Sequence, residues 1–428
     1  MADYILLRHR DIPNLHQLDV YRQNGGYEAF KKVVTTMTPQ QVVGEIKASG
    51  LRGRGGAGFP TGMKWSFLTK DSFPRYLVVN SDESEPGTFK DREIMEKNPH
   101  QFLEGVMITA YAAQAHVAYN YLRGEFWDVA AGLDKILAEL RAAGLLGDKL
   151  FGTDYGLNIY NHLGAGAYIC GEESALLESL EGKLGQPRLK PPFPADKGLY
   201  QKPTVVNNTE TLTNVPMIIA KGAAWYKTIG TEKSPGPKIF CLSGNIVKPG
   251  NYELPLGIPF AELLAIAGGV RGGRKLKAVI PGGVSCPVIP AEKMMTLTMD
   301  FDTVKAAGSG LGTCSSIVMD ETTCMVKTLR RISRFYHAES CGQCTPCREG
   351  TGWLHRVLTR IVDGVGTKAD VDMLVDVANK IEGHTICAFG DAAAWPVQSF
   401  IKHFRHEFEY MVEHKGRSIV DDLPSVAA

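Results

Sequence analysis

Four cysteines constrain the C-terminal part of this chain more than any other feature. Cys341, Cys344 and Cys347 follow one another at two-residue gaps, and Cys387 lies further along the chain. Three thiolates on one loop can point to a common centre, and a fourth from a distant helix end can complete the ligand set of an iron–sulfur cluster. Structural zinc also uses Cys-x-x-Cys, but it more often combines two separate pairs. The spacing therefore favours a 4Fe–4S cluster, with zinc as the alternative.

Length and composition exclude several classes of protein. A chain of 428 residues is expected to form about two or three domains. Charged residues make up 22% of the chain and the net charge is only +1, so there is no electrostatic case for binding nucleic acid. No apolar run approaches the roughly 18 residues of a membrane span. The first residues, MADY, lack the core of a signal peptide and the look of a transit peptide, so we expect a cytoplasmic protein.

A glycine-rich stretch, SGLRGRGGAGFPTG, matches the spacing of the dinucleotide-binding fingerprint at Gly53, Gly55 and Gly58. That fingerprint requires a strand before the glycines and a helix after them. Here residues 38–50 predict a helix before the glycines, capped by Thr38 and ended by Gly50, and residues 59–62 predict a turn after them. We therefore expect a different kind of ligand loop.

The flanks of this loop favour a ligand over a flexible turn. Glycines let a ligand lie against the backbone, Arg54 and Lys64 supply cations, and Phe59 and Phe67 supply flat faces. A simple turn would explain the glycines but not these four side chains.

The order of helical and extended patterns predicts three regions. Residues 24–236 alternate between the two, with strands expected at 75–80, 115–122 and 157–160, which predicts an α/β domain. After the prolines around residue 235, short strands and a single helix at 260–267 predict a small β-rich module. Helical spacing at 322–336, 353–362, 371–381 and 392–412 predicts a helical region around the cysteines.

Polar residues cluster at three further points. Residues 80–87, NSDESEPG, follow an expected strand, where open α/β sheets place ligands, although a solvated acidic loop is an equal alternative. Glu172 and Glu173 follow a second glycine-rich stretch and open a helix, where they are either ligand contacts or partners of the helix dipole. Asn207 and Asn208 could bind phosphate or ring edges, but two asparagines are common in turns.

Taken together, RGRGGAGFPTG, NSDESEPGTFKDR, GAGAYICGEES, RLKPPFP, VVNNTET, SCGQCTPCREG and TICAFGD resemble the NADH-oxidising flavoprotein subunit of respiratory complex I, the F-type subunit of NADH:quinone oxidoreductase. The resemblance implies a Rossmann-like FMN-binding domain at residues 1–236. It implies a ubiquitin-like β-grasp domain at 237–320 and a helical bundle with a 4Fe–4S cluster at 321–428.

The resemblance also implies roles for individual residues. The residues expected around FMN are Gly53, Arg54, Gly55, Lys64, Asn80, Asp82, Ser84, Tyr168, Gly171, Glu172, Asn207 and Asn208. Those expected to meet NADH are Phe59, Phe67, Glu85, Glu173, Lys190 and Phe193, with Glu85 and Glu173 at the catalytic centre. The cluster ligands are expected to be Cys341, Cys344, Cys347 and Cys387.

The implied activity is hydride transfer from NADH to FMN, followed by single-electron transfer through the cluster and ultimately to quinone. The implied partners are a thioredoxin-like 2Fe–2S subunit and other peripheral-arm subunits, so that membrane contact is indirect and the chain has no span of its own. The alternative within this resemblance is the diaphorase subunit of a soluble NAD-linked hydrogenase or formate dehydrogenase. A zinc-stabilised nucleotide-binding scaffold without redox activity is the alternative from another class.

The sequence departs from the family pattern at a few positions. Leu163 stands where an arginine is usual, Thr209 where valine is usual, and Tyr200-Gln201 where Trp-Gly is usual. None of them removes an expected ligand, although Leu163 could alter the loop beside the flavin.

Overall fold

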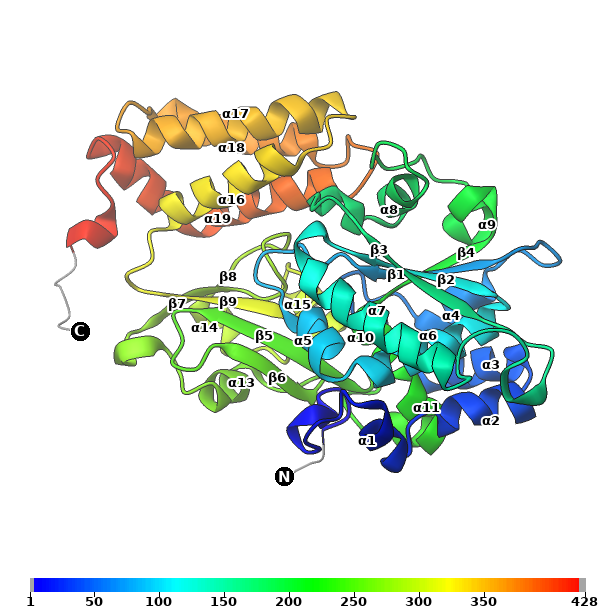
Figure 1. The fold of residues 1–428 in the computed structure, drawn as a ribbon. Helices are drawn as coiled ribbons and strands as arrows, with labels where there is room; N and C mark the ends of the chain where they lie inside the picture. The colour runs from blue at the N-terminus through cyan, green and yellow to red at the C-terminus, as the bar shows by residue number, and fades with distance from the viewer. Residues whose placement is uncertain (1–3, 423–428) are drawn as a thin grey trace. The chain divides into compact units, whose positions relative to one another are not determined.

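A computed structural model describes residues 4–422 (Figure 1). The chain divides into two compact units. The first comprises residues 4–84, 89–240 and 251–257, and the second comprises residues 85–88, 241–250 and 258–422. No helix within residues 4–422 combines the length and the apolar character that crossing a bilayer requires.

The first unit is built on a four-stranded parallel sheet. Its strands are β1 (Tyr76–Ser81), β2 (Val117–Leu122), β3 (Asn158–Leu163) and β4 (Thr204–Asn208), in the order β3-β2-β1-β4. The three strands expected from the sequence are confirmed, and β4 was not expected as a strand. Because the chain winds outward from β1 in both directions, the strand order reverses between β1 and β4, where open α/β sheets bind ligands.

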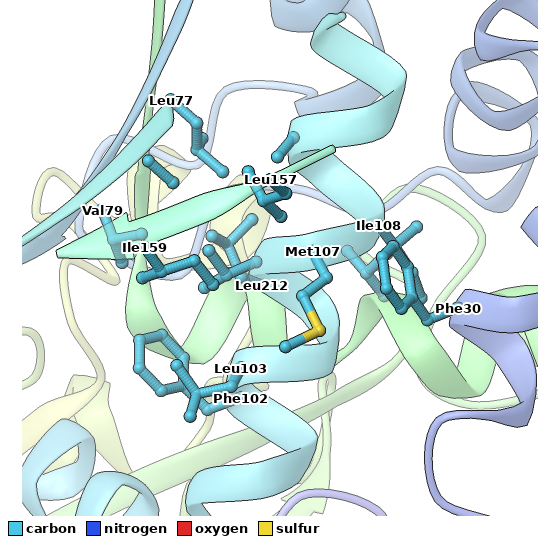
Figure 2. Close-up of a cluster of buried hydrophobic side chains, with 14 of the residues drawn as sticks. Phe30, Leu77, Val79, Phe102, Leu103, Met107, Ile108, Leu157, Ile159 and Leu212 are labelled. Carbon is cyan, nitrogen blue, oxygen red and sulfur yellow. The ribbon is translucent and has the colours of Figure 1, made fainter. Parts of the chain in front are cut away.

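The core of this unit lies between the sheet and α6 (Pro99–Ala113), a helix that is buried at nearly every position. Figure 2 shows side chains of α6, including Phe102, Leu103 and Met107, close to the sheet residues Val79 and Ile159. Each fully buried apolar side chain of this size stabilises the fold by about 1.5–3 kcal/mol. This packing fixes the strands whose ends carry the polar residues.

The glycine-rich loop joins two helices. The helix expected at residues 38–50 is confirmed as α3 (Pro39–Ser49), with a capping box formed by Thr38 and Gln41 and with Gly50 ending it at φ 69°. The expected turn at residues 59–62 is wrong, because α4 (Thr61–Ser66) begins there. Pro60 has the extended conformation that precedes a helix, and Thr61 and Trp65 are buried.

The other helices of the first unit are short or surface elements. They are α1 (Leu18–Gln23), α2 (Glu28–Thr36), α5 (Lys90–Lys97), α7 (Trp127–Ala142), α8 (Glu173–Leu180), α9 (Pro194–Lys197), α10 (Thr209–Thr213), α11 (Val215–Lys221) and α12 (Ala223–Tyr226), with 3₁₀ turns η1 (Arg8–Arg10), η2 (Gly124–Phe126), η3 (Leu150–Gly152), η4 (Tyr168–Gly171) and η5 (Leu199–Gln201).

A second, mixed sheet follows in the sequence. Its strands are β5 (Pro237–Gly244), β6 (Gly250–Pro255), β7 (Leu276–Ile280), β8 (Ile289–Pro290) and β9 (Ser315–Asp320), in the order β6-β5-β9-β7-β8. The sequence predicted a single helix in this region, found as α13 (Phe260–Ile266). That prediction is incomplete, because η6 (Arg271–Gly273), α14 (Ala291–Met294) and α15 (Phe301–Ala306) also form. Helices this short have no detectable apolar period, and α15 depends on a cap from Asp300.

Four longer helices form the C-terminal region, as expected. They are α16 (Met325–Glu339), α17 (Thr345–Val362), α18 (Lys368–Ile381) and α19 (Phe389–Glu413), followed by η7 (Ile419–Asp422). The helix expected from residue 353 begins earlier, at Thr345, because Pro346 occupies the first turn, where a missing N–H is tolerated. The division into three domains at residues 236 and 320 stays a prediction.

Candidate functional site

The carboxyl ends of β1 and β4 bring two of the polar motifs together. Asn80 and Asn208 are register partners on these neighbouring parallel strands, and Val79 pairs with Asn207. The sequence placed these residues more than a hundred positions apart, and the sheet places them side by side at the point where its strand order reverses. The carboxyl ends of β1 and β4 therefore form the base of the candidate site.

The glycine-rich loop lies directly against the end of β4. A Cβ added to Gly55 would lie 2.9 Å from the Cβ of Asn208, so only glycine fits there without a shift. The backbone N–H of Arg54 donates to Oγ1 of Thr211 at 2.8 Å. Beside Gly56, which has a φ of +137°, an added Cβ would meet no atom within 4 Å. The loop therefore combines a tight backbone approach with open space, as a ligand cradle requires.

The side chain of Arg54 does not occupy that open space. Its guanidinium is fully buried and donates to the hydroxyl of Tyr226 at 3.1 Å and to the carbonyl oxygens of Pro235 at 2.8 Å and Pro237 at 3.1 Å. The expectation that Arg54 supplies an accessible cation is corrected by this placement, because three acceptors in the interior hold the charge. Only its backbone belongs to the loop surface.

A second glycine-rich segment closes on the end of β1. Nδ2 of Asn80 donates to the carbonyl oxygen of Gly171 at 2.8 Å, and an added Cβ at Gly171 would lie 3.4 Å from Oδ2 of Asp82. The hydroxyl of Ser84 donates to Oδ1 of Asp82 at 3.1 Å. These contacts bring Asn80, Asp82, Ser84 and η4, which includes Tyr168, into one group.

A network of four charged side chains lies at the start of α8. Lys64 contacts Glu173 at 2.8 Å, and Lys190 contacts Glu172 at 2.7 Å and Glu173 at 3.1 Å. Glu172 also caps the helix by accepting from the backbone N–H of Ser174 and Ala175. Burial by itself would raise the pKa of Glu173, but Lys64 and Lys190 outweigh it and the pKa is lowered. Glu173 is therefore an ionised anchor for two lysines.

The three aromatic side chains expected to meet NADH are exposed to solvent. Phe59 is 45% exposed, Phe67 55% and Phe193 57%, and the rings of Phe59 and Phe67 have centroids 6.1 Å apart. Large apolar rings left in water are favourable places for a planar ligand to stack.

Behind the strand ends lies a buried group of charges that sequence reasoning missed. Glu83, Lys90, Asp91, Glu210 and Lys238 are all buried. Lys90 contacts Asp91 and Glu210 at 2.9 Å each, and Lys238 also pairs with Glu210. Lys90 and Asp91 stand in the quoted NSDESEPGTFKDR motif, but nothing in a single sequence shows that Glu210 and Lys238 join them.

This buried group touches the site through Asn208. Nδ2 of Asn208 donates to Oδ2 of Asp91 at 2.8 Å, and the carboxylate of Glu83 accepts from the backbone N–H of Asp91 at 2.8 Å and of Arg92 at 3.1 Å. Burial and the neighbouring charge of Asp91 raise the pKa of Glu83 to about 7. Trp65 fixes the adjacent Asn207 by donating to its Oδ1 at 2.8 Å.

The four cysteines lie in the second unit, three around the connection from α16 to α17 and one before α19. Cys341 and Cys344 lie between α16 and α17, Cys347 lies in the first turn of α17, and Cys387 precedes α19. The backbone N–H of Ile386 donates to Sγ of Cys344 at 3.3 Å, so the two loops are in contact. Burial raises the pKa of the Cys347 thiol to about 11. Within residues 4–422, no set of three or more His, Cys, Asp or Glu side chains is arranged to hold a metal ion.

Glu85 belongs to the second unit. Its Oε1 accepts from the backbone N–H of Ser285 at 2.8 Å, and its side chain fills the space in which a Cβ of Gly283 would stand. Its expected catalytic role stays a prediction.

The fold and these groups of residues define a class of protein. It combines an α/β domain, with its candidate ligand site where the strand order reverses, and a helical region that contains four grouped cysteines. Comparisons with known proteins agree with this class. Residues 46–217 match the family described as Nuo51 FMN-binding domain, residues 238–305 match the SLBB domain, and residues 327–411 match the NADH-ubiquinone oxidoreductase-F iron-sulfur binding region.

Relatives with curated names cover almost the whole chain. The NADH-quinone oxidoreductase F subunit 2 of Rhizobium meliloti (strain 1021) is 53% identical over 97% of this chain and 99% of its own length. The NADH-quinone oxidoreductase F subunit of Rickettsia bellii (strain OSU 85-389) is 52% identical over 93% of this chain and 96% of its own. The chain belongs to the family of NADH-quinone oxidoreductase F subunits, so the resemblance seen in the sequence is confirmed.

A solved structure supports the fold. A chain of an NAD⁺-reducing [NiFe]-hydrogenase in the H₂-reduced state superposes with a TM-score of 0.83 at 36% identity, over 90% of this chain and 64% of that chain. The predicted fold class is confirmed: a Rossmann-like α/β region, a small β-rich module and a helical region with an iron–sulfur match.

Proposed function

We propose that this chain is the NADH-oxidising subunit of an NADH-quinone oxidoreductase, with FMN and a 4Fe–4S cluster as its cofactors. The observation that carries the proposal is the convergence of the glycine-rich loop with Asn80 and Asn208 at the reversal of strand order. When bound, FMN accepts a hydride and gives up electrons one at a time, which the 4Fe–4S cluster passes on.

The residues present fit a flavin nucleotide. The absence of a Cβ at Gly55 and the open space beside Gly56 allow a ligand to approach the loop backbone. Amide, carboxylate and hydroxyl groups of Asn80, Asp82 and Ser84 supply donors and acceptors for a polyol chain and ring edge. The full set proposed to hold FMN is Gly53, Arg54 through its backbone, Gly55, Lys64, Asn80, Asp82, Ser84, Tyr168, Gly171, Glu172, Asn207 and Asn208.

Binding and orientation of NADH are assigned to the exposed rings and the charge network. Phe59, Phe67 and Phe193 offer stacking faces, and Lys64 and Lys190 offer cations held in place by Glu173. Because the pKa of Glu173 is lowered, its carboxylate is ionised at neutral pH and positions the lysines rather than donating a proton. Hydride transfer itself needs no general acid or base. The role proposed for Glu85 rests on the family resemblance alone.

The cluster ligands proposed are Cys341, Cys344, Cys347 and Cys387. The contact between Ile386 and Cys344 shows that the loop before α19 meets the loop between α16 and α17, as a ligand set drawn from both loops requires. Binding of the cluster requires these cysteines as thiolates.

The relatives' names describe subunits of a larger assembly, which supports an electron-accepting partner for this chain as well. We propose a thioredoxin-like 2Fe–2S subunit and other peripheral-arm subunits as neighbours, and a cytoplasmic position with indirect membrane association. The hydrogenase structure keeps a diaphorase role as the second candidate. Its lower sequence identity makes that role the weaker of the two.

An anaerobic NADH titration of the chain, purified with its co-expressed partners, tests the proposal. Flavin absorbance should bleach with added NADH, and an electron paramagnetic resonance signal of a reduced 4Fe–4S cluster should appear. Bound flavin that ignores NADH, or a protein with zinc and no flavin, would overturn the proposal. Hydrogen-driven reduction of NAD⁺ by the purified assembly would instead favour the diaphorase role.

A further inference from the structure

Positive charge is concentrated on one helical hairpin of the second unit. Residues 325–362, which form α16, α17 and the loop between them, contain seven Lys or Arg and two Glu, a formal net charge of +5. The whole chain has a net charge of only +1. The hairpin therefore has a strong local excess of positive charge, which negative charges elsewhere in the chain offset.

Six side chains of this hairpin form what we call the basic patch: Arg330, Arg331, Arg334 and His337 from α16, and His355 and Arg356 from α17. The two helices pack against each other (Figure 1). The rings of His337 and His355 are stacked with centroids 6.1 Å apart. Gly352 allows this approach, because a Cβ there would lie 3.1 Å from His337 and 3.4 Å from Nη1 of Arg356.

The charges of the basic patch are scarcely neutralised within the described chain. In residues 4–422, no carboxylate lies within 4.0 Å of the guanidinium of Arg331, Arg334 or Arg356, and Arg330 reaches only Asp363, at 3.9 Å between exposed groups. By contrast, Arg405 on α19 contacts two carboxylates, at 2.6 Å and 2.7 Å. Burial, His337, Arg330 and Arg334 together lower the pKa of His355, as expected where cations gather.

Such a group of exposed cations opposes folding through like-charge repulsion, and an anionic partner would remove that opposition. The planar guanidinium group binds carboxylates through two parallel hydrogen bonds. Trp353, 50% exposed, lies three residues before Arg356 on α17 and so shares its side of the helix. Tryptophan and arginine are both among the residues enriched at the energetic centres of protein–protein interfaces.

We infer that the basic patch, with Trp353, is the docking surface for an acidic protein subunit that receives electrons from the cysteine centre. The inference rests on the proposed function, because α16 ends and α17 begins on either side of Cys341 and Cys344. A partner seated on the hairpin would therefore lie beside the loop that holds the proposed cluster. Opposite charges would also accelerate its association at low ionic strength.

The test compares charge reversal in the basic patch with matched reversal elsewhere. The full chain is tagged and co-expressed with the other subunits of its oxidoreductase, as wild type, as R331E/R334E/R356E and as the control K31E/K135E/K227E. The control lysines are exposed and lie in the first unit. Recovery of the other subunits on the tagged chain should fall at least tenfold for the patch variant and stay near wild type for the control.

Two further measurements keep the test decisive. NADH oxidation with ferricyanide as acceptor should be unchanged in the patch variant, which would show that the chain is folded and contains its flavin. The charge-conserving variant R331K/R334K/R356K should restore assembly in part. If the proposed function fails, ferricyanide activity is absent in wild type while the loss of assembly still appears. Full assembly of the patch variant, or wild-type binding to a short DNA duplex or phosphatidylglycerol vesicles in preference to the subunits, would overturn the inference.

Discussion

Glu210 is the centre of the buried charge group, and replacing it with glutamine should lower the free energy of unfolding of the first unit. Its carboxylate contacts Lys90 at 2.9 Å, pairs with Lys238 and accepts the backbone N–H of Ile239 at 2.9 Å. Glu210→Gln preserves the shape but removes the charge. Lys90 would keep Asp91, whereas Lys238 would have no carboxylate partner among the described residues.

The magnitude follows from burial. Removing one partner of a buried ion pair costs about 3–5 kcal/mol, and the lower end applies here because Lys90 keeps a partner, so we expect about 3 kcal/mol. The matched control is Glu96→Gln, which breaks a solvent-accessible pair with Arg92 in the same unit and should cost about 0.5 kcal/mol. Urea unfolding at constant pH, followed by the fluorescence of released FMN, measures both losses.

The pH dependence and a double variant sharpen this prediction. Burial opposes the charge of Glu210, but Lys238 and Lys90 outweigh it and lower its pKa. Its contribution is therefore complete above the ordinary glutamate pKa and is lost as pH falls through the lowered value. Adding Lys238→Met should recover most of the stability lost in Glu210→Gln. A loss below about 1 kcal/mol at neutral pH, or no recovery in the double variant, would refute the reasoning.

Three further predictions concern the glycine-rich loop, the buried charge group and the cysteines. Gly55→Ala should weaken FMN binding at least tenfold in a fluorescence titration, because the added methyl group would displace Asn208. The control Gly44→Ala should leave FMN binding unchanged, because a Cβ at Gly44 meets no atom within 4 Å. Glu83→Gln should flatten the pH dependence of the free energy of unfolding between about pH 5 and 7. In the wild type the raised pKa of Glu83 makes this free energy fall as pH rises through that window, by up to about 3 kcal/mol. An identical slope in both proteins would contradict this prediction. Cys387→Ala should abolish or degrade the 4Fe–4S signal in electron paramagnetic resonance, and a normal signal would exclude Cys387 as a ligand.

Local signals in the sequence predicted much of the fold. The helix before the glycine-rich loop has a capping threonine, a proline in its first turn and a terminating glycine, and all three appear as expected in α3. The four C-terminal helices have clear apolar spacing and were all found, three of them starting within three residues of the expected position and α17 starting eight residues earlier than expected. The motif match at Gly53, Gly55 and Gly58 was correctly set apart from a standard fingerprint, because the preceding element is a helix.

The sequence could not supply what depends on contacts between distant segments. The side chain of Arg54 looked like a free cation beside glycines, but its three acceptors come from residues 226–237. Helix α4 was missed because it is only six residues long and begins behind a proline. Nothing in the sequence marks Glu210 as the centre of a charge group, since its two lysine partners lie at positions 90 and 238.

The pairing of β1 with β4 also sets an order for biosynthesis. The base of the proposed flavin site needs Asn80 and Asn208, and the glycine-rich loop is fastened by the hydrogen bond from Arg54 to Thr211. A ribosome that has released only the first three strands has therefore made most of the contacting side chains but no binding site. Flavin loading must wait until residue 211 has left the exit tunnel, and the cysteine loops emerge later still.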